Sequence, residues 1–200
     1  MPPGGRRSRR SPEAVAERRA ARAEVEDVGK VVEYGAWLLE SRSRTVADLR
    51  RRLATAGFKA ALVEEAIGRL VELGFLDDEA FASAWVESRD RARPRGEHAL
   101  RRELALKGVD RDVIDGVLAA RRGEVDDQDD PFIGPVIGDP DRVAAERLLE
   151  RRRAALLREP DPRKRRAKAY ALLARNGFAP DIASDLSRRI EPTDDETSSD

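Results

Sequence analysis

The chain contains no cysteine, a single histidine and only 4% aromatic residues. The absence of cysteine excludes disulfides, thiolate nucleophiles and cysteine-based metal sites. No apolar run reaches the roughly eighteen residues that a membrane-spanning helix needs. The N-terminus is basic but has no apolar stretch behind it, as a signal peptide would. We therefore expect a cytoplasmic protein that makes no contact with a membrane.

Charge is abundant, at 39% of the residues, and its net value of zero hides a strong segregation. Residues 123–141 carry seven acidic and no basic side chains, whereas residues 145–190 carry thirteen basic and six acidic ones. This segregation favours a polyanion or an acidic protein surface as the partner. Arg, Ala, Leu and Glu dominate, and all four favour helices. Because alternating apolar and β-branched runs are nearly absent, the chain is predicted to be all-α.

One short pattern occurs three times along the chain. It appears as LRRRLATAGF at residues 49–58, as LRRELALKGV at 100–109 and, more faintly, as AYALLARNGF at 169–178. Each copy places two small or apolar residues four apart, then a glycine, then another apolar residue. Apolar side chains also follow five and nine residues after each glycine. Such an internal repeat decides the architecture and is therefore interpreted first.

Each copy predicts a helix, a glycine turn and a second helix. Residues four apart lie on the same helix face, and glycine adopts the left-handed conformation that ends a helix. Two helices leave an apolar face uncovered, and a candidate third helix precedes each copy. The predicted fold is therefore an all-α tandem array of three three-helix repeats, curved and elongated, with disordered basic N-terminal and acidic C-terminal tails. The expected segments are a largely disordered basic tail (1–24), repeat 1 (30–74), repeat 2 (75–122), an acidic linker (123–141), repeat 3 (142–190) and an acidic tail (191–200).

The first helix of repeat 1 is expected over residues 31–40, with an inner stripe of Val32, Ala36 and Leu39. Trp37 lies beside this stripe, and core packing is the favoured interpretation over stacking on bases; the same holds for Trp85. The last helix of repeat 1 is expected to carry Leu62, Ala66, Leu70 and Leu73 on its inner face. In repeat 3, Tyr170 and Leu173 are expected to face inward. A solvated helix over residues 14–26 could extend the basic tail.

Three polar residues carry the sequence signature of a helix N-cap. Thr45 precedes the second helix of repeat 1, Asp110 the last helix of repeat 2, and Asp161 is followed by a proline. Short side chains with an oxygen acceptor satisfy the unpaired amides of a first helical turn, and proline suits the first helical position. Each of these residues is therefore predicted to begin a helix.

The residues that could support catalysis are sparse. His98 has no evident nucleophile or orienting partner, so a surface or capping role is favoured. The acidic cluster at 126–130 lacks the glycine and distal glutamate of a calcium loop, and a solvated linker is the favoured interpretation. No glycine-rich phosphate loop is present. The sequence predicts no catalytic residue, no metal and no cofactor.

Basic side chains remain as the candidates for function. At 100° per residue Arg51 points away from the apolar pair Leu49 and Leu53, and Arg102 does the same in the next copy. Repeated cations on the outer face could form a binding stripe, or they could be a solvated surface; a basic N-terminal arm on nucleic acid is a further alternative. The candidates for binding a partner or DNA are Arg50, Arg51, Arg52, Arg91, Arg93, Arg95, Arg101, Arg102, Arg163, Lys164, Arg165, Arg166 and Lys168.

The two clearest copies and the segment that joins them resemble the RecX family, which regulates the RecA recombinase. The joint reads LVELGFLDDEAFASAWVESR and is the most specific part. The resemblance covers residues 31–189, with the third copy weaker and placed after a long acidic insertion. The positions of the joint that follow the family pattern are Leu73, Gly74, Phe75, Leu76, Asp77, Asp78, Phe81 and Ala82.

The resemblance implies binding in the groove of the RecA filament on DNA, where the protein bridges protomers, and no catalysis of its own. We expect the protein to be a monomer. The resemblance also implies that ATP hydrolysis and strand exchange by RecA are inhibited, although activation and recycling stay open. Two other classes of function are kept beside it. One is a helical-repeat protein that binds DNA directly, and the other is a structural adaptor whose surface arginines have no partner.

Overall fold

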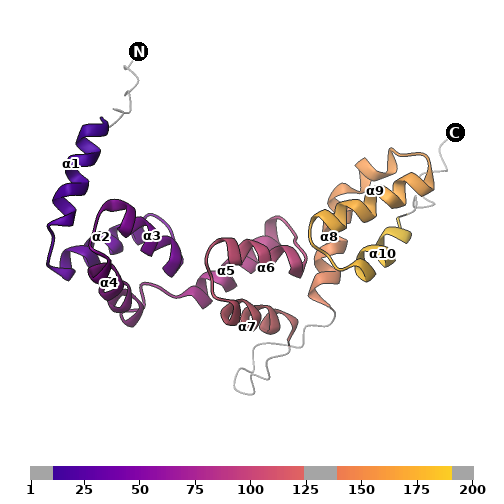
Figure 1. Cartoon of the computed structure of the whole chain (residues 1–200). Coiled ribbons are helices and arrows are strands. Elements are labelled where there is room, and N and C mark those ends of the chain that lie inside the picture. Colours follow the sequence, from indigo (N-terminus) through magenta and orange to yellow (C-terminus); the bar gives the residue numbers. More distant parts are fainter. Residues whose placement is uncertain (1–10, 124–138, 191–200) are drawn as a thin grey trace, which may run out of the picture. The chain divides into compact units, whose positions relative to one another are not determined.

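A computed structural model describes residues 11–123 and 139–190, which form ten α-helices and no strand (Figure 1). The all-α prediction is therefore confirmed for the described part of the chain. The chain divides into two compact units, unit 1 ending at Asp78 and unit 2 beginning at Glu79. The helices are α1 Pro12–Ala23, α2 Val28–Glu40, α3 Val46–Ala56, α4 Ala60–Glu72, α5 Asp78–Ala92, α6 Glu97–Leu106, α7 Arg111–Arg122, α8 Pro140–Leu157, α9 Pro162–Arg175 and α10 Pro180–Arg188.

The three repeated glycines end helices as the sequence predicts. Their φ angles are 108° at Gly57, 82° at Gly108 and 83° at Gly177, in the left-handed region where other residues are strained. In each turn the amide after the glycine donates to the carbonyl five residues earlier, which is the Schellman motif. These bonds are Phe58 N to Leu53 O at 3.4 Å, Val109 N to Leu104 O at 3.2 Å and Phe178 N to Leu173 O at 3.3 Å.

The apolar residues of the pattern form the cores. Helices α2–α4 enclose one buried cluster in unit 1, and unit 2 contains two clusters, one within α5–α7 and one within α8–α10. The aligned pairs of all three copies are fully buried: Leu49 and Leu53, Leu100 and Leu104, Ala169 and Leu173. The repeated sequence thus produces a repeated packing unit, because each helix pair buries the same face.

The stripe expected on the first helix of repeat 1 packs against the core, but the most deeply buried line of α2 lies one position away from it. Val31 and Gly35 are the buried residues of α2, whereas Val32, Ala36 and Leu39 are only partly buried. The reason is a close approach of α4: a Cβ at Gly35 would lie 2.8 Å from a methyl carbon of Leu70. Because glycine counts as neutral in an apolar pattern, the pattern missed the position that matters most for this packing.

Three large side chains expected inside lie outside. Trp37 is 59% exposed and Leu73 is 64% exposed, and Tyr170 is also exposed. Leu73 is the C-cap of α4, so it lies beyond the last turn that packs on the core. Trp37 is displaced because the inner stripe of α2 runs through Val31 and Gly35 instead. By contrast, Trp85 is partly buried against the core of α5–α7.

The three predicted N-caps are confirmed. Thr45 accepts from the amide of Asp48 at 3.1 Å, and Asp110 accepts from the amide of Asp112 at 2.9 Å. Asp161 accepts from the amide of Arg163 at 2.8 Å, with Pro162 at the first helical position. These local signals succeeded because a cap depends on neighbours in sequence and not on tertiary packing.

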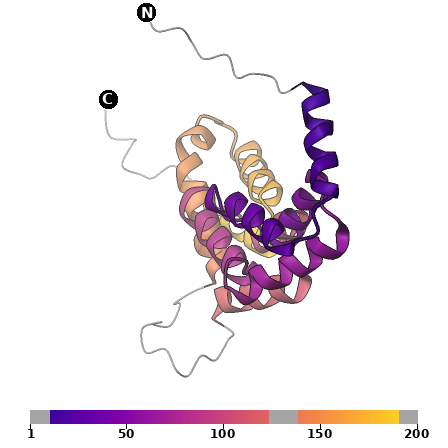
Figure 2. The same cartoon turned by 90° about the vertical axis from the view of Figure 1, so that its left-hand side faces the viewer.

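The solvated helix that could extend the basic tail over residues 14–26 is present as α1, which begins at Pro12 and ends at Ala23. Ser11 caps it by accepting a hydrogen bond from the amide of Ala14. Figures 1 and 2 show α1 at the outside of the α2–α4 bundle. Helix α8 begins at Pro140, inside the stretch expected as the acidic linker. The rest of that linker, with the 126–130 cluster, and the acidic tail lie outside the described residues. Within the described part no helix is both long and apolar enough to cross a membrane.

Candidate polyanion-binding surfaces

The arginines that begin the first two copies form equivalent ion pairs across the helix turn. Arg50 binds Glu64 with two hydrogen bonds of 2.7 and 2.9 Å, and Arg101 binds Asp115. Both pairs span fourteen residues and join the second helix of a repeat to the third. Arg50 and Arg101 are therefore partly occupied in holding their own repeats. The acids at matching positions of the two copies were the sequence signal that could have revealed this.

The next arginine of each copy points outward, as the helix geometry predicts. Arg51 is 71% exposed, and Arg102 is exposed as well. Arg102 forms no ion pair with any residue that the structure describes. Arg51 binds Asp48, which lies one turn earlier on the same helix. These two cations are thus available to a partner at little structural cost.

Asp48 is the anion at the centre of an arginine cluster in unit 1. Its carboxylate accepts from Arg44 at 3.0 Å and Arg52 at 2.9 Å, and also from Arg51. Burial opposes ionisation of Asp48, but the bonds from Arg52, Arg44 and Arg51 outweigh it and lower its pKa from the usual 3.8 to about 2. One negative charge thus holds three guanidinium groups, and the cluster keeps an excess of positive charge.

The basic run of the third copy is divided by its fold. Arg165 is only 6% exposed and donates to the carbonyls of Ile190 at 3.3 Å and Glu159 at 3.1 Å. The expectation that Arg165 lies on the outer face is therefore wrong, because its guanidinium satisfies backbone carbonyls in the core of α8–α10. Arg163, Lys164, Arg166 and Lys168 are exposed, and Lys168 pairs with Glu159.

Two of the arginines before the second copy, Arg93 and Arg95, line a notch in unit 2. This notch has a volume of about 390 Å³ and is lined by Ala92, Arg93, Pro94, Arg95, Leu148, Arg151, Arg152 and Asn176. Arg151 donates to the carbonyls of Ala92 at 2.7 Å and Arg91 at 2.9 Å, which closes the C-terminal end of α5. Arg93 and Arg152 are exposed and form no ion pair with the described residues. We name this site the α5–α8 notch.

Arg91 and Arg95 differ in how far the fold occupies them. Arg91 is 78% exposed and pairs with Glu87 one turn away at 3.1 Å. Arg95 donates to Asn176 of α9's C-terminal turn and lies 3.4 Å from Glu103. Its Nε is buried without a hydrogen-bond partner in the described chain. Arg91 is therefore presented to solvent, and Arg95 mainly joins α6 to the following repeat.

A second basic groove lies in unit 1 and was missed by sequence reasoning. It has a volume of about 500 Å³ between α1, α2 and α3, and we name it the unit-1 groove. Four arginines line it and no described lining residue is acidic. The lining residues are Val15, Arg19, Arg22, Tyr34, Leu38, Arg51, Arg52, Thr55 and Ala56. Arg19 and Arg22 were not predicted as binding residues, because the sequence does not indicate which side of a solvated helix packs against the bundle.

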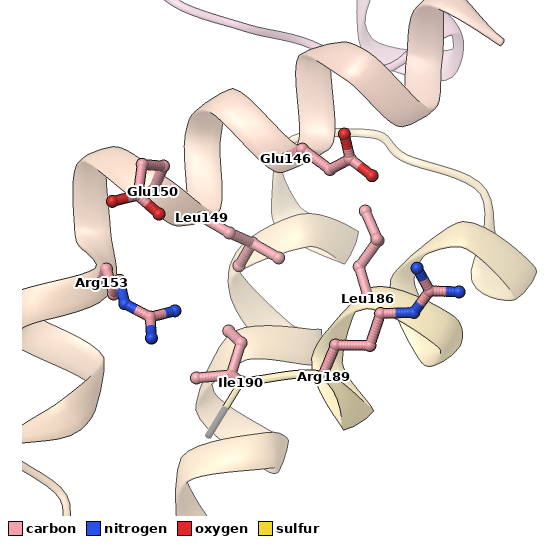
Figure 3. Close-up of a pocket in the computed structure, with 7 residues that line it drawn as sticks. All are labelled: Glu146, Leu149, Glu150, Arg153, Leu186, Arg189 and Ile190. Atoms are coloured by element: carbon pink, nitrogen blue, oxygen red, sulfur yellow. The ribbon is translucent and has the colours of Figure 1, made fainter. Parts of the chain in front are cut away.

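A third hollow, between α8 and α10, has a different chemistry. Figure 3 shows Leu149, Leu186 and Ile190 converging at its base, with Glu146 and Arg189 at its rim. Glu150 and Arg153 complete the lining of this hollow of about 190 Å³. Because two acids and two bases line it, the hollow has no net charge to attract a polyanion.

The strongest charge cluster of unit 2 is buried and balanced. Arg121, whose side chain is 8% exposed, binds Asp90 with bonds of 3.0 and 2.9 Å and Asp141 at 2.6 Å. Asp141 also accepts from the amide of Glu97 at 2.9 Å, which caps α6 where Gly96 offers no side chain. Burial raises the pKa of Asp141, although the bonds from Glu97 and Arg121 oppose this. The cluster joins α5, α6, α7 and α8.

Comparison with known proteins gives these features a context. A family model described as "RecX, second three-helix domain" matches residues 77–118. Regulatory protein RecX of Mycolicibacterium vanbaalenii is 34% identical over 154 residues, which cover 74% of this chain and 76% of that protein. Regulatory protein RecX of Mycobacterium leprae is 37% identical over 143 residues, covering 71% of this chain and 74% of the relative.

Solved structures share the fold. The crystal structure of RecX from Lactobacillus salivarius superposes with a TM-score of 0.64 at 18% identity, covering 82% of this chain and 97% of that one. A second crystal structure, of regulatory protein RecX, gives 0.59 at 20% identity and covers 84% and 71% of the two chains. Fold and surface together define an all-α protein of tandem three-helix repeats with arginine-rich grooves. Its relatives show that the chain belongs to the RecX family of regulatory proteins.

Proposed function

We propose that this protein regulates the RecA recombinase by binding along the groove of the RecA–DNA filament, and that it inhibits the filament. Membership in the RecX family carries the proposal. The chemistry of the described surface supports it. Four arginines line the unit-1 groove and four line the α5–α8 notch, so both sites suit a partner that is rich in negative charge. The protein acts as a cytoplasmic monomer without catalysis or a cofactor.

The contact surface is proposed from the arginines that the fold leaves accessible. Arg51, Arg91, Arg93 and Arg102 are exposed and lie on or beside the two grooves or on the outer face of α6. Arg165 is excluded from the contact surface because it is buried. Arg101 is a weaker candidate for a contact because two acids already bind it. Exposed cations speed encounter and set specificity more than they add to stability.

The test is the ATPase activity of RecA on single-stranded DNA with increasing amounts of this protein. We expect inhibition and co-sedimentation of the protein with RecA–DNA filaments. Unchanged hydrolysis together with no co-sedimentation would contradict the proposal, and faster hydrolysis would contradict its inhibitory sign.

Direct binding to DNA is the second candidate, favoured by the arginines of the unit-1 groove that have no acidic partner. It is distinguished by measuring DNA affinity without RecA as salt increases. Phosphate contacts release counterions, so the affinity of a direct binder falls steeply with salt.

A further inference from the structure

Helix α1 contacts the rest of unit 1 through two of its arginines, Arg19 and Arg22. None of its residues is buried, so apolar burial contributes little to its position. Arg19 lies against the turn at Gly57, where a Cβ would come within 2.6 Å of both its Cγ and its carbonyl oxygen. Arg22 lies over the ring of Tyr34, at 4.6 Å from its centre, and 5.8 Å from that of Phe58. On this side the unit-1 groove is therefore lined by Arg19 and Arg22, together with Val15.

The opposite wall of the groove is also cationic. Arg51 and Arg52 project from α3, and both bind the carboxylate of Asp48. That carboxylate stays ionised, but its single negative charge cannot neutralise the three arginines that bind it. Arg19 and Arg22 form no ion pair with any residue in the described part of the chain. The groove therefore offers several guanidinium groups to anions spaced along a chain.

One aromatic ring lines the groove beside Arg22, and a second packs against that ring from outside the groove lining. Tyr34 lines the groove, and its ring centre is 5.5 Å from that of Trp37 on the next turn of α2. Trp37 is 59% exposed. Trp37 belongs to no core cluster of the described chain, so its indole is accessible beside the ring of Tyr34. Trp85 shows the contrast, because its indole donates to Glu103 at 3.0 Å and packs between Arg89 and Lys107.

We propose that the unit-1 groove and Trp37 form a binding site for single-stranded nucleic acid, an inference that rests on the second candidate function, direct binding to DNA. The arginines of the groove hold consecutive phosphates, and the indole of Trp37 stacks on an unpaired base. Cations that follow the backbone next to a ring that stacks on bases are the general chemistry of such sites. A duplex fits less well, because its bases are already stacked on one another. An acidic protein would engage the arginines but has no use for the exposed indole.

The site concerns the protein alone, so its test contains no RecA. The probe is an oligonucleotide of twenty deoxythymidines, and the readout is the fluorescence of Trp37 in the Trp85→Phe variant. If that variant does not fold, the signal of Trp37 is obtained as the difference between the wild type and Trp37→Leu. We expect the oligonucleotide to quench Trp37 and polyglutamate of equal charge to leave it unchanged.

Affinity is measured separately, by anisotropy of the labelled oligonucleotide. Trp37→Leu should weaken binding at least fivefold, since stacking on one base contributes roughly 1–3 kcal/mol. Arg19→Gln with Arg51→Gln should weaken it at least as much and should flatten its salt dependence. The matched control is Arg69→Gln with Arg111→Gln, which removes two exposed, ion-paired arginines that do not line the groove. This control should bind within twofold of the wild type.

Three outcomes would overturn the proposal. The first is equal quenching by polyglutamate, which would assign the groove to an acidic protein. The second is tighter binding of a twenty-base-pair duplex than of the single strand. The third is unchanged affinity in Trp37→Leu or in the groove double variant. None of these results bears on RecA regulation, which the ATPase measurement tests independently.

Discussion

The two charge clusters of this protein are built in opposite ways. Around Asp48 in unit 1, one carboxylate binds three arginines, and Arg51 remains 71% exposed. Around Arg121 in unit 2, one guanidinium binds Asp90 and Asp141 and is almost entirely buried. The first arrangement leaves positive charge at the surface, next to a groove. In the second arrangement the charges neutralise one another, and their ion pairs hold together the helices that meet there. Composition cannot distinguish them, since both are simply arginine and aspartate.

The largest effect should come from removing the buried cation. Arg121→Leu leaves Asp90 and Asp141 without their partner in a low-dielectric site, and breaking a buried pair costs roughly 3–5 kcal/mol. Urea unfolding should show this loss, and Arg52→Leu at the Asp48 cluster should lose about 1 kcal/mol or less. Equal losses in the two variants would remove the distinction between the clusters.

The loss of stability on truncating a buried apolar side chain provides a reference for these two values. Leu104 is fully buried in the core of α5–α7, so Leu104→Ala should destabilise by roughly 2–5 kcal/mol. The same urea titration measures it, with Leu106→Ala as control, because Leu106 is 86% exposed. A loss of a few tenths for Leu104→Ala would mean that the repeated apolar pair is not what stabilises the repeat.

The exposed cations should affect function more than stability. Arg51→Glu with Arg102→Glu should change the free energy of unfolding by about 1 kcal/mol or less, because both side chains are exposed. Inhibition of the RecA ATPase should weaken severalfold at low salt, and this difference should shrink as salt screens the wild-type attraction. Arg69→Glu with Arg111→Glu is the matched control. Full inhibition by the folded double variant would mean that Arg51 and Arg102 are solvated surface residues that do not contact RecA.

The smallest effect is a difference in titration. The arginines lower the pKa of Asp48 to about 2, so its contribution to stability is present above pH 3.8 and lost as the pH falls toward 2. Burial raises the pKa of Asp141, so its contribution has the opposite sign and is lost as the pH rises through that raised value. Carbon-13 shifts of the two carboxyl groups should therefore titrate in the order Asp141, then Asp48, as acid is added. Coincident titration would contradict the contrast.

Local signals in the sequence were sufficient wherever the physics is local. The glycine turns, the caps at Thr45, Asp110 and Asp161, and the buried apolar pairs all depend on residues within about one helical turn of each other. The prediction failed at Gly35, where the deciding contact comes from Leu70 on another helix. Trp37 was misplaced for the same reason, since its exposure follows from the position of that contact.

The sequence by itself determined an all-α repeat protein with a positive surface, because helical periodicity, glycine turns and charge are written residue by residue. Only the tertiary structure decided which arginines that surface presents. Arg165 donates hydrogen bonds to backbone carbonyls, Arg101 pairs with Asp115, and Arg121 pairs with Asp90 and Asp141. Arg19 and Arg22 instead became the wall of a groove. An arginine is always charged, but whether that charge is available depends on which acids and carbonyls the fold brings within about 3 Å of it.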